Sequence, residues 1–96
     1  MSQAFVNDDA EVPEPRRSYA LPPPDAPEYE AAVAATLLEA ARAGETAAAE
    51  QATGYRWGDP GLHPHVRRIL EAEEARAEAE QDRRLVQLAR RFLRAG

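Results

Sequence analysis

Apolar residues recur at helical spacing in the first half of the chain. A helix is expected over residues 28–43, and its apolar face is formed by Tyr29, Val33, Leu37, Ala40 and Ala41. The next stretch, 45–53, consists mainly of Ala and predicts a short second helix. Gly44 and Gly54 follow the two stretches and are suitable stop residues. The pattern therefore predicts a tight helical hairpin with closely approaching Ala faces.

The start of the first helix also carries sequence signals. Asp25 precedes Glu28 by three residues, which resembles a capping box, and Pro27 suits a first turn. We therefore expect Asp25 to cap the helix.

The second half of the chain contains two further apolar stripes. A third helix is expected to start at Pro64, with His63 as the residue before it, and its stripe consists of Val66, Ile69, Leu70 and Ala72. The stripe within 82–94 consists of Leu85, Val86, Leu88, Ala89, Phe92 and Leu93. Asp82 is a candidate N-cap for that segment.

The stretch between these stripes leaves two alternatives open. Residues 71–82 contain Ala, Glu and Arg but no large apolar side chain, so they favour helix by propensity without anchoring a core. One long helix over 64–94 is the first alternative. The second, which we favour, is a break near residues 80–82 that folds the Leu85, Leu88 and Phe92 stripe back onto the preceding helix.

Residues 1–27 show no pattern of a folded element. They hold six of the eight prolines, and Leu21-Pro22-Pro23-Pro24 predicts a short polyproline II piece. Few large apolar groups are available there to offset the entropy of ordering. We expect a disordered, acidic, Pro-rich tail over 1–27 and a helical domain over 28–96. The predicted fold class is all-α, a small bundle of three to four helices arranged as two helical hairpins.

Charge is distributed unevenly along the chain. The net charge is −5 for residues 1–30, −2 for 31–62 and +2 for 63–96, although the whole chain carries −5. All 12 basic residues are Arg. Candidate contacts for an anion lie near the C-terminus, at Arg83, Arg84, Arg90, Arg91 and Arg94. The alternative, which we favour, is a solvated helix face with cations near its C-terminal end.

The loop over 54–61 is the least ordinary part of the chain. Its density of Gly and Pro is expected to exclude regular structure, and it holds Tyr55, Arg56 and Trp57. These residue types dominate the energetics of protein interfaces. The alternative, favoured in so short a domain, is that Tyr55 and Trp57 fill the core between the hairpins. Phe5 and Val6 in the tail are further candidates for protein contact.

No residue pattern indicates catalysis, a cofactor or a metal. His63 and His65 flank a single residue, no Cys accompanies them, and we interpret them as an N-cap and a surface side chain. The acids between residues 71 and 82 alternate with Ala and Arg, which predicts a solvated face rather than paired catalytic carboxylates. No apolar run approaches the length of a membrane span. We therefore predict no enzyme, no cofactor, no metal, no membrane contact and no small-molecule substrate.

The opening residues support one family resemblance. Met1-Ser2-Gln3-Ala4-Phe5-Val6-Asn7-Asp8-Asp9-Ala10, followed by Glu and Pro residues, resembles the N-terminal leader of some Gre-type bacterial transcription elongation factors. That leader typically reads Met-Ser-x-Ala-Phe-Val and continues with acids and prolines. The resemblance implies a bacterial setting near RNA polymerase.

The resemblance does not reach the parts that give Gre factors their activity. These factors carry two acids at a coiled-coil tip, in a pattern such as Gly-Asp-Leu-Ser-Glu. In the comparable stretch, Gly44-Glu45-Thr46-Ala47-Ala48, Glu45 matches the first acid and Ala48 stands in place of the second. The C-terminal binding domain of that family has no counterpart, so stimulation of transcript cleavage is not predicted.

Together these observations predict a bacterial, cytoplasmic, non-enzymatic module for protein–protein interaction. Its partner is another protein or a second copy of the chain, since the expected core is small enough to be completed from outside. The alternative is a transcription-associated regulator that contacts RNA polymerase or nucleic acid through the leader and the Arg-rich C-terminal helix. Nucleic acid is the less favoured partner because the whole chain is acidic.

Overall fold

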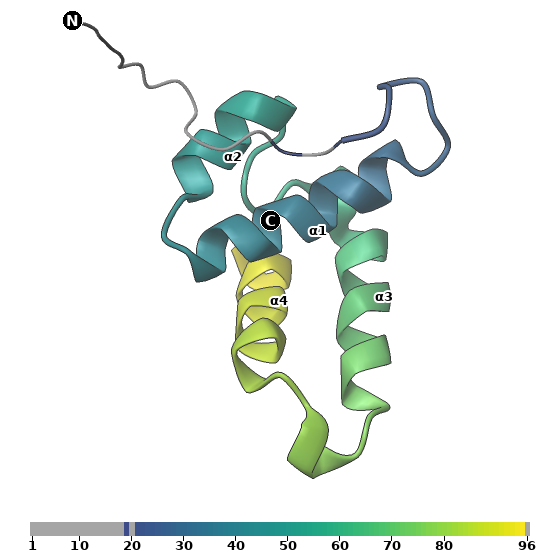
Figure 1. The fold of residues 1–96 in the computed structure, drawn as a ribbon, viewed down its shortest axis with the longest axis vertical. Coiled ribbons are helices and arrows are strands. Elements are labelled where there is room, and N and C mark those ends of the chain that lie inside the picture. Colours follow the sequence, from purple (N-terminus) through teal and green to yellow (C-terminus); the bar gives the residue numbers. More distant parts are fainter. Residues whose placement is uncertain (1–18, 20, 96) are drawn as a thin grey trace, which may run out of the picture.

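The computed structural model describes Tyr19 and residues 21–95, and this part of the chain is all-α (Figure 1). Helices α1 (Tyr29–Arg42) and α2 (Thr46–Thr53) form one hairpin, and α3 (His63–Glu74) and α4 (Arg83–Ala95) form a second. Two 3-10 turns, η1 (Pro60–Leu62) and η2 (Glu78–Glu80), lie in the connections. The predicted bundle of two helical hairpins is confirmed, with four α-helices among the described residues.

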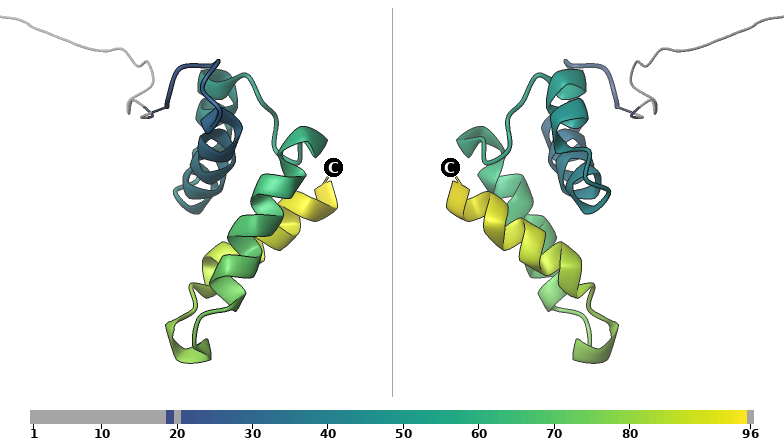
Figure 2. Two further views of the ribbon diagram at one scale, coloured as in Figure 1. Left: turned by 90° about the vertical axis from the view of Figure 1, so that its right-hand side faces the viewer. Right: turned by 90° about the vertical axis from the view of Figure 1, so that its left-hand side faces the viewer.

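The two hairpins form two layers. Figure 2 shows α1 and α2 on one side and the antiparallel pair of α3 and α4 on the other. Helix α1 contacts each of the other three helices, so it is the central element of the bundle.

The core lies where α1 crosses the second hairpin. Its largest fully buried side chains are Val33, Leu37, Leu38, Leu62, Val66 and Phe92. Val33 and Leu37 belong to the stripe predicted for the first helix. Burial of both Val66 and Phe92 confirms that the second apolar stripe of the C-terminal half folds back onto the first. Burying these side chains is the main favourable contribution to folding.

The connection between α1 and α2 is closed by its backbone. Gly44 has a φ of 74°, its N–H donates to the carbonyl of Ala41 at 3.1 Å, and the N–H of Glu45 donates to the carbonyl of Ala40 at 2.7 Å. This pair of bonds is the Schellman motif, in which glycine accepts a left-handed conformation at low cost. Gly54 ends α2 in the same left-handed region, with φ 79°. Both predicted stop residues are confirmed.

The connection between α3 and α4 starts earlier than predicted. Helix α3 ends at Glu74. The prediction that residues 71–82 are helical, made from their helix propensity, is therefore wrong for residues 75–82. The predicted break before the last apolar stripe is confirmed. The side-chain amide of Gln81 donates to the carbonyls of Glu74 and Arg76, both at 3.1 Å. Asp82 caps α4 as predicted, because its Oδ1 accepts the N–H of Leu85 at 3.1 Å.

Two local predictions were wrong. No side chain caps α1: the residue before it is Glu28, and backbone bonds from Ala26 to Pro23 and from Tyr29 to Ala26 form the turn instead of Asp25. The loop after α2 also contains regular structure, the 3-10 turn at its end. Asp59 stabilises that turn by accepting the N–H of Gly61 at 2.8 Å.

Described residues that precede α1 pack against the helical bundle. Tyr19 and Leu21 are half-buried and pack against the core cluster. The rest of the predicted tail, residues 1–18 and Ala20, lies outside the described residues, and so do the candidates Phe5 and Val6. Among the described helices, none combines the length and apolar character needed to cross a bilayer.

Candidate interaction surfaces

Trp57 is half-buried and packs against the core. Its indole ring meets the ring of Phe92 edge to face, with centroids 4.9 Å apart, and its backbone N–H donates to Oε2 of Glu50 at 2.7 Å. Both contacts tie the loop to helices of different hairpins. The structure thus gives Trp57 the packing role that we favoured from the sequence.

Tyr55 joins the loop to α1. Its hydroxyl donates to Oε2 of Glu30 at 3.2 Å, and the ring packs against the core cluster. Burial raises the pKa of the Tyr55 phenol, and the hydrogen bond to the Glu30 carboxylate raises it further. Arg56 lies between these two aromatic residues but is exposed, and it forms no ion pair within the described part of the chain. Of the three loop candidates, Arg56 is exposed, whereas Tyr55 and Trp57 are half-buried and keep part of their surface open to a partner.

The two histidines do not occupy the predicted positions. Leu62, not His63, precedes α3, and the His63 ring lies half-buried at 6.0 Å from the ring of Phe92. His63 Nε2 is 3.1 Å from the carbonyl oxygen of Gly58. His65 is also half-buried, with Nε2 at 3.6 Å from Oε1 of Glu30. Both rings therefore help to join α3 to the rest of the bundle.

The acidic stretch is not uniformly a solvated face. Glu73 is only 8% exposed, and its Oε2 accepts the N–H of Asp82 at 2.6 Å and a guanidinium N–H of Arg76 at 3.2 Å. The prediction was wrong at this position because residue 73 lies on the same side of α3 as the buried Val66, two turns earlier. The other acids, Glu71, Glu74, Glu78 and Glu80, are exposed as predicted.

Asp82 links three helices. One of its carboxylate oxygens lies 2.5 Å from Nη2 of Arg42 on α1, while its backbone N–H is held by Glu73 on α3. The hydrogen bond from Arg42 lowers the pKa of Asp82, and the N–H of Leu85 lowers it further. The charge on Asp82 is therefore part of the contact between the two layers.

The predicted anion contacts fall into two groups. Arg83 and Arg84 begin α4, next to the acidic connection, whereas Arg90, Arg91 and Arg94 lie in its last turns. Nη2 of Arg90 is 2.5 Å from Oε2 of Glu74. The other four are exposed and form no ion pair with any described residue. The five candidate arginines are thus spread along α4, with two at its start and three in its last turns.

The fold brings two further arginines to the last turns of α4. Because the hairpin is antiparallel, the start of α3 lies beside the end of α4 (Figure 1), and Arg67 and Arg68, in the second turn of α3, belong to the half of α3 nearer that end. Both are exposed and unpaired within the described residues. They were missed because their proximity to α4 depends on the direction in which the hairpin closes. The sequence signal that could have revealed them is that two arginines stand next to each other in a stretch without acids.

We call this group the arginine end: Arg67, Arg68, Arg90, Arg91 and Arg94. No acid occurs in residues 63–70 or 85–95, which form this half of the hairpin. Arg67 precedes Glu74 by two helical turns and Arg94 follows Arg90 by one, so helical periodicity places both on the side of the hairpin that carries the Glu74–Arg90 pair. The acids of the second hairpin all lie at the opposite end, in residues 71–82.

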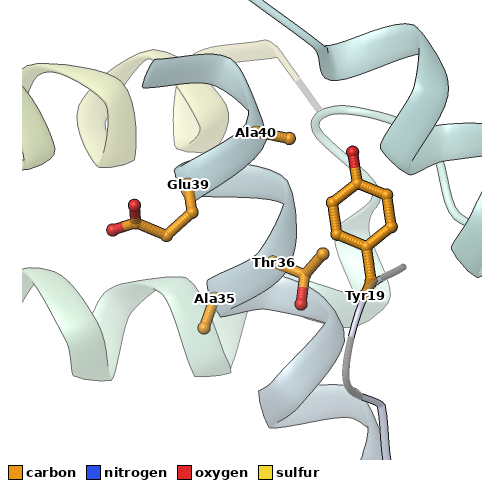
Figure 3. Close-up of a pocket in the computed structure, with 5 residues that line it drawn as sticks. All are labelled: Tyr19, Ala35, Thr36, Glu39 and Ala40. Atoms are coloured by element: carbon orange, nitrogen blue, oxygen red, sulfur yellow. The ribbon is translucent and has the colours of Figure 1, made fainter. Parts of the chain in front are cut away.

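The described residues show no arrangement suited to a metal ion, since no three His, Asp or Glu side chains gather there. A pocket of about 200 Å³ lies on α1, lined by Tyr19, Ala35, Thr36, Glu39 and Ala40 (Figure 3). It contains one carboxylate, Glu39, whose partner is Arg42 at 3.5 Å.

Comparison with known proteins yields no relative: no family model, no curated protein and no solved structure matches the chain. The likeness of the opening residues to a Gre-type leader therefore stays a prediction.

Proposed function

We propose that the protein is a non-enzymatic interaction module that binds an acidic segment of another protein through the arginine end. The observation that carries the proposal is the concentration of five arginines in residues 63–70 and 85–95 of the α3–α4 hairpin, which contain no acid. One of the five, Arg90, pairs with Glu74 from outside these stretches. Four of them, Arg67, Arg68, Arg91 and Arg94, have no ion-pair partner among the described residues. Guanidinium groups bind carboxylates in a planar, bidentate fashion.

The size of this surface favours a short acidic segment of a protein. Arg67 lies only four residues, about 6 Å along the helix axis, before Glu71, where the acids of the second hairpin begin. A long polyanion placed along the hairpin would meet those acids at the other end. The first hairpin is acidic too, and the whole chain carries −5. A local acidic patch on a protein avoids this repulsion.

The magnitude of such contacts points to reversible binding. Each exposed ion pair contributes roughly 0.2–1 kcal/mol, so the set adds a few kcal/mol, about two to three orders of magnitude in Kd. Binding should weaken as salt rises, because exposed charges are screened over about 8–10 Å at physiological ionic strength.

A second candidate function is the binding of nucleic acid or of RNA polymerase by the same arginines. Guanidinium groups bind phosphate as readily as carboxylate, and the leader resembles that of transcription factors that act on RNA polymerase. The absence of Cys from the chain suits a reducing compartment, and we place the module in the bacterial cytoplasm. A second copy of the chain is the remaining candidate partner.

Fluorescence anisotropy on the whole protein separates these partners. The probes are a labelled glutamate-rich peptide and a labelled duplex DNA, each titrated at 50 and 200 mM salt. The proposal expects the peptide to bind more tightly than the duplex and to lose affinity at the higher salt. Tighter binding to DNA would support the second candidate, and binding of neither probe would contradict both.

A further inference from the structure

The chain covers part of its own α1 surface with an aromatic side chain. Tyr19 lies over Thr36 and Ala40 of α1, and Leu21 packs against the same core two residues later (Figure 3). Figure 2 places this part of the chain on the side of the first hairpin that faces away from α3 and α4. We call Tyr19 and Leu21 the strap and the space beside Tyr19 the α1 pocket.

The strap is held by side-chain packing alone. Its one backbone bond is internal, from the N–H of Leu21 to the carbonyl of Tyr19 at 2.9 Å, and no hydrogen bond between described residues ties it to α1 or α2. The hydroxyl of Tyr19 is buried but has no hydrogen-bond partner. Burial of an unpaired hydroxyl opposes docking, so the strap is less tightly bound than its contact with the core suggests.

The strap also leaves its site incompletely filled. The α1 pocket is an open hollow that retains about 200 Å³ beside the Tyr19 ring. The space exists because α1 presents small side chains here, Ala35, Thr36 and Ala40. Figure 3 shows Thr36 and Ala40 on the side of α1 that faces Tyr19, whereas the carboxylate of Glu39 points away from the ring.

We propose that the α1 pocket is a docking site for an extended segment of a partner protein, and that the strap is its replaceable occupant. The segment would present an aromatic residue followed two positions later by an aliphatic residue, as Tyr19 and Leu21 do. Pro22, Pro23 and Pro24 connect the strap to α1 by a stiff piece of chain, which keeps the strap near the pocket when it is displaced. This site is independent of the arginine end.

The test uses a labelled peptide with the sequence of residues 15–24 and the full-length protein. A tethered strap competes at an effective concentration in the millimolar range. We therefore expect a double variant, Tyr19→Ala with Leu21→Ala, to bind the peptide at least about tenfold more tightly than the natural chain does. Thr36→Arg, which fills the pocket, should abolish this binding in the double variant, and Thr36→Ser should preserve it.

Equal affinity of both proteins for the peptide, or binding that survives Thr36→Arg, would overturn the proposal. If the double variant does not fold, the natural chain labelled with 3-fluorotyrosine still provides a test. Its Tyr19 ¹⁹F resonance, assigned with Tyr19→Phe, should move from a docked to a free position as peptide is added. A resonance that stays docked at saturating peptide overturns the proposal. So does a dimer that Tyr19→Ala abolishes, because the occupant would then be a second copy.

Discussion

The α1–α2 turn spans residues 43–45 and is closed by backbone hydrogen bonds, whereas the α3–α4 connection spans residues 75–82 and is closed by side chains. The first turn depends on the φ of a single residue, Gly44. The second depends on Glu73, Gln81 and Asp82, and through Arg42 it reaches the other layer of the bundle. The comparison shows that one hairpin is determined locally, while the other is determined by the assembled fold.

The hairpins also differ in charge. Residues 28–53 carry five acids and one Arg, while the half of the second hairpin formed by 63–70 and 85–95 carries five Arg and no acid. The α1–α2 hairpin thus presents an acidic surface and the α1 pocket, which is lined in part by small side chains. The α3–α4 hairpin presents the arginine end. Any loss of the α3–α4 connection should therefore disturb the arginine end before it disturbs the α1 pocket.

The largest effect is expected at Phe92, which joins the second hairpin to the loop and to α1. Phe92→Ala should lower the free energy of unfolding by about 3–5 kcal/mol, because the ring is fully buried and packs on Trp57. Urea unfolding followed by circular dichroism measures the change. Leu93→Ala, at a half-buried position beside it, should cost clearly less. Equal costs would mean that the hairpin does not pack as described.

The side-chain closure of the second connection is tested at Glu73. Glu73→Ala should cost about 1–3 kcal/mol, because the N–H of Asp82 and the guanidinium of Arg76 lose their acceptor. The matched control is Glu74→Ala, which removes the exposed pair with Arg90 and should cost less than about 1 kcal/mol. Thermal unfolding of both variants compares them. A larger loss for Glu74→Ala would place the important contact at the surface.

The backbone closure of the first connection is tested at Gly44. Gly44→Ala should cost about 1–2 kcal/mol through the left-handed conformation alone, since no atom lies within 4 Å of an added Cβ. Gly44→Asn should cost less, because Asn tolerates this region. Chemical denaturation of the two variants gives the ordering. A neutral Gly44→Ala would show that the Schellman turn opens without penalty.

The smallest effect is a dependence on acid pH. Because Arg42 holds the pKa of Asp82 below its ordinary value of 3.8, the ionised carboxylate contributes stability above that value and loses it as the pH falls through the lowered pKa. Asp82→Asn keeps a cap but removes the ionisation, so its unfolding should depend less on pH below about 4 than that of the natural chain. Parallel thermal melts from pH 2 to pH 6 measure the difference. Identical pH profiles would remove Asp82 from the contact between the layers.

The sequence predictions were more successful for the α1–α2 hairpin, which is determined locally, than for the α3–α4 hairpin, which depends on the assembled fold. The first hairpin, its apolar face and both stop glycines were predictable because helical periodicity and the conformational freedom of Gly act within a few residues. The end of α3 was not, since residues 75–82 have a helical composition and are held out of the helix by contacts of Glu73, Gln81 and Asp82 that form only when the chain folds back. Arg42 meets Asp82 across forty residues of sequence, and no local pattern signals that contact.

The candidate surfaces divide in the same way. The arginines of α4 stand out as a run in the sequence, but Arg67 and Arg68 join them only through the antiparallel closure of the hairpin. Tyr55 and Trp57 were recognised as unusual residues, and their packing role followed from the small size of the core. Tyr19 lies within the stretch predicted as a tail, and its site on α1 exists only in the fold.

The most direct test of the arginine end is a double charge reversal with a matched control. Arg67→Glu with Arg94→Glu changes the net charge as much as Arg56→Glu with Arg84→Glu, and all four side chains are exposed. The measurement is the affinity of the glutamate-rich peptide for each double variant and for the natural chain at 50 mM salt. The proposal predicts that the first variant loses at least about tenfold in Kd, the equivalent of 1.4 kcal/mol, while the second loses clearly less. Equal losses would show that only total charge matters, and they would contradict a binding site at this end of the hairpin.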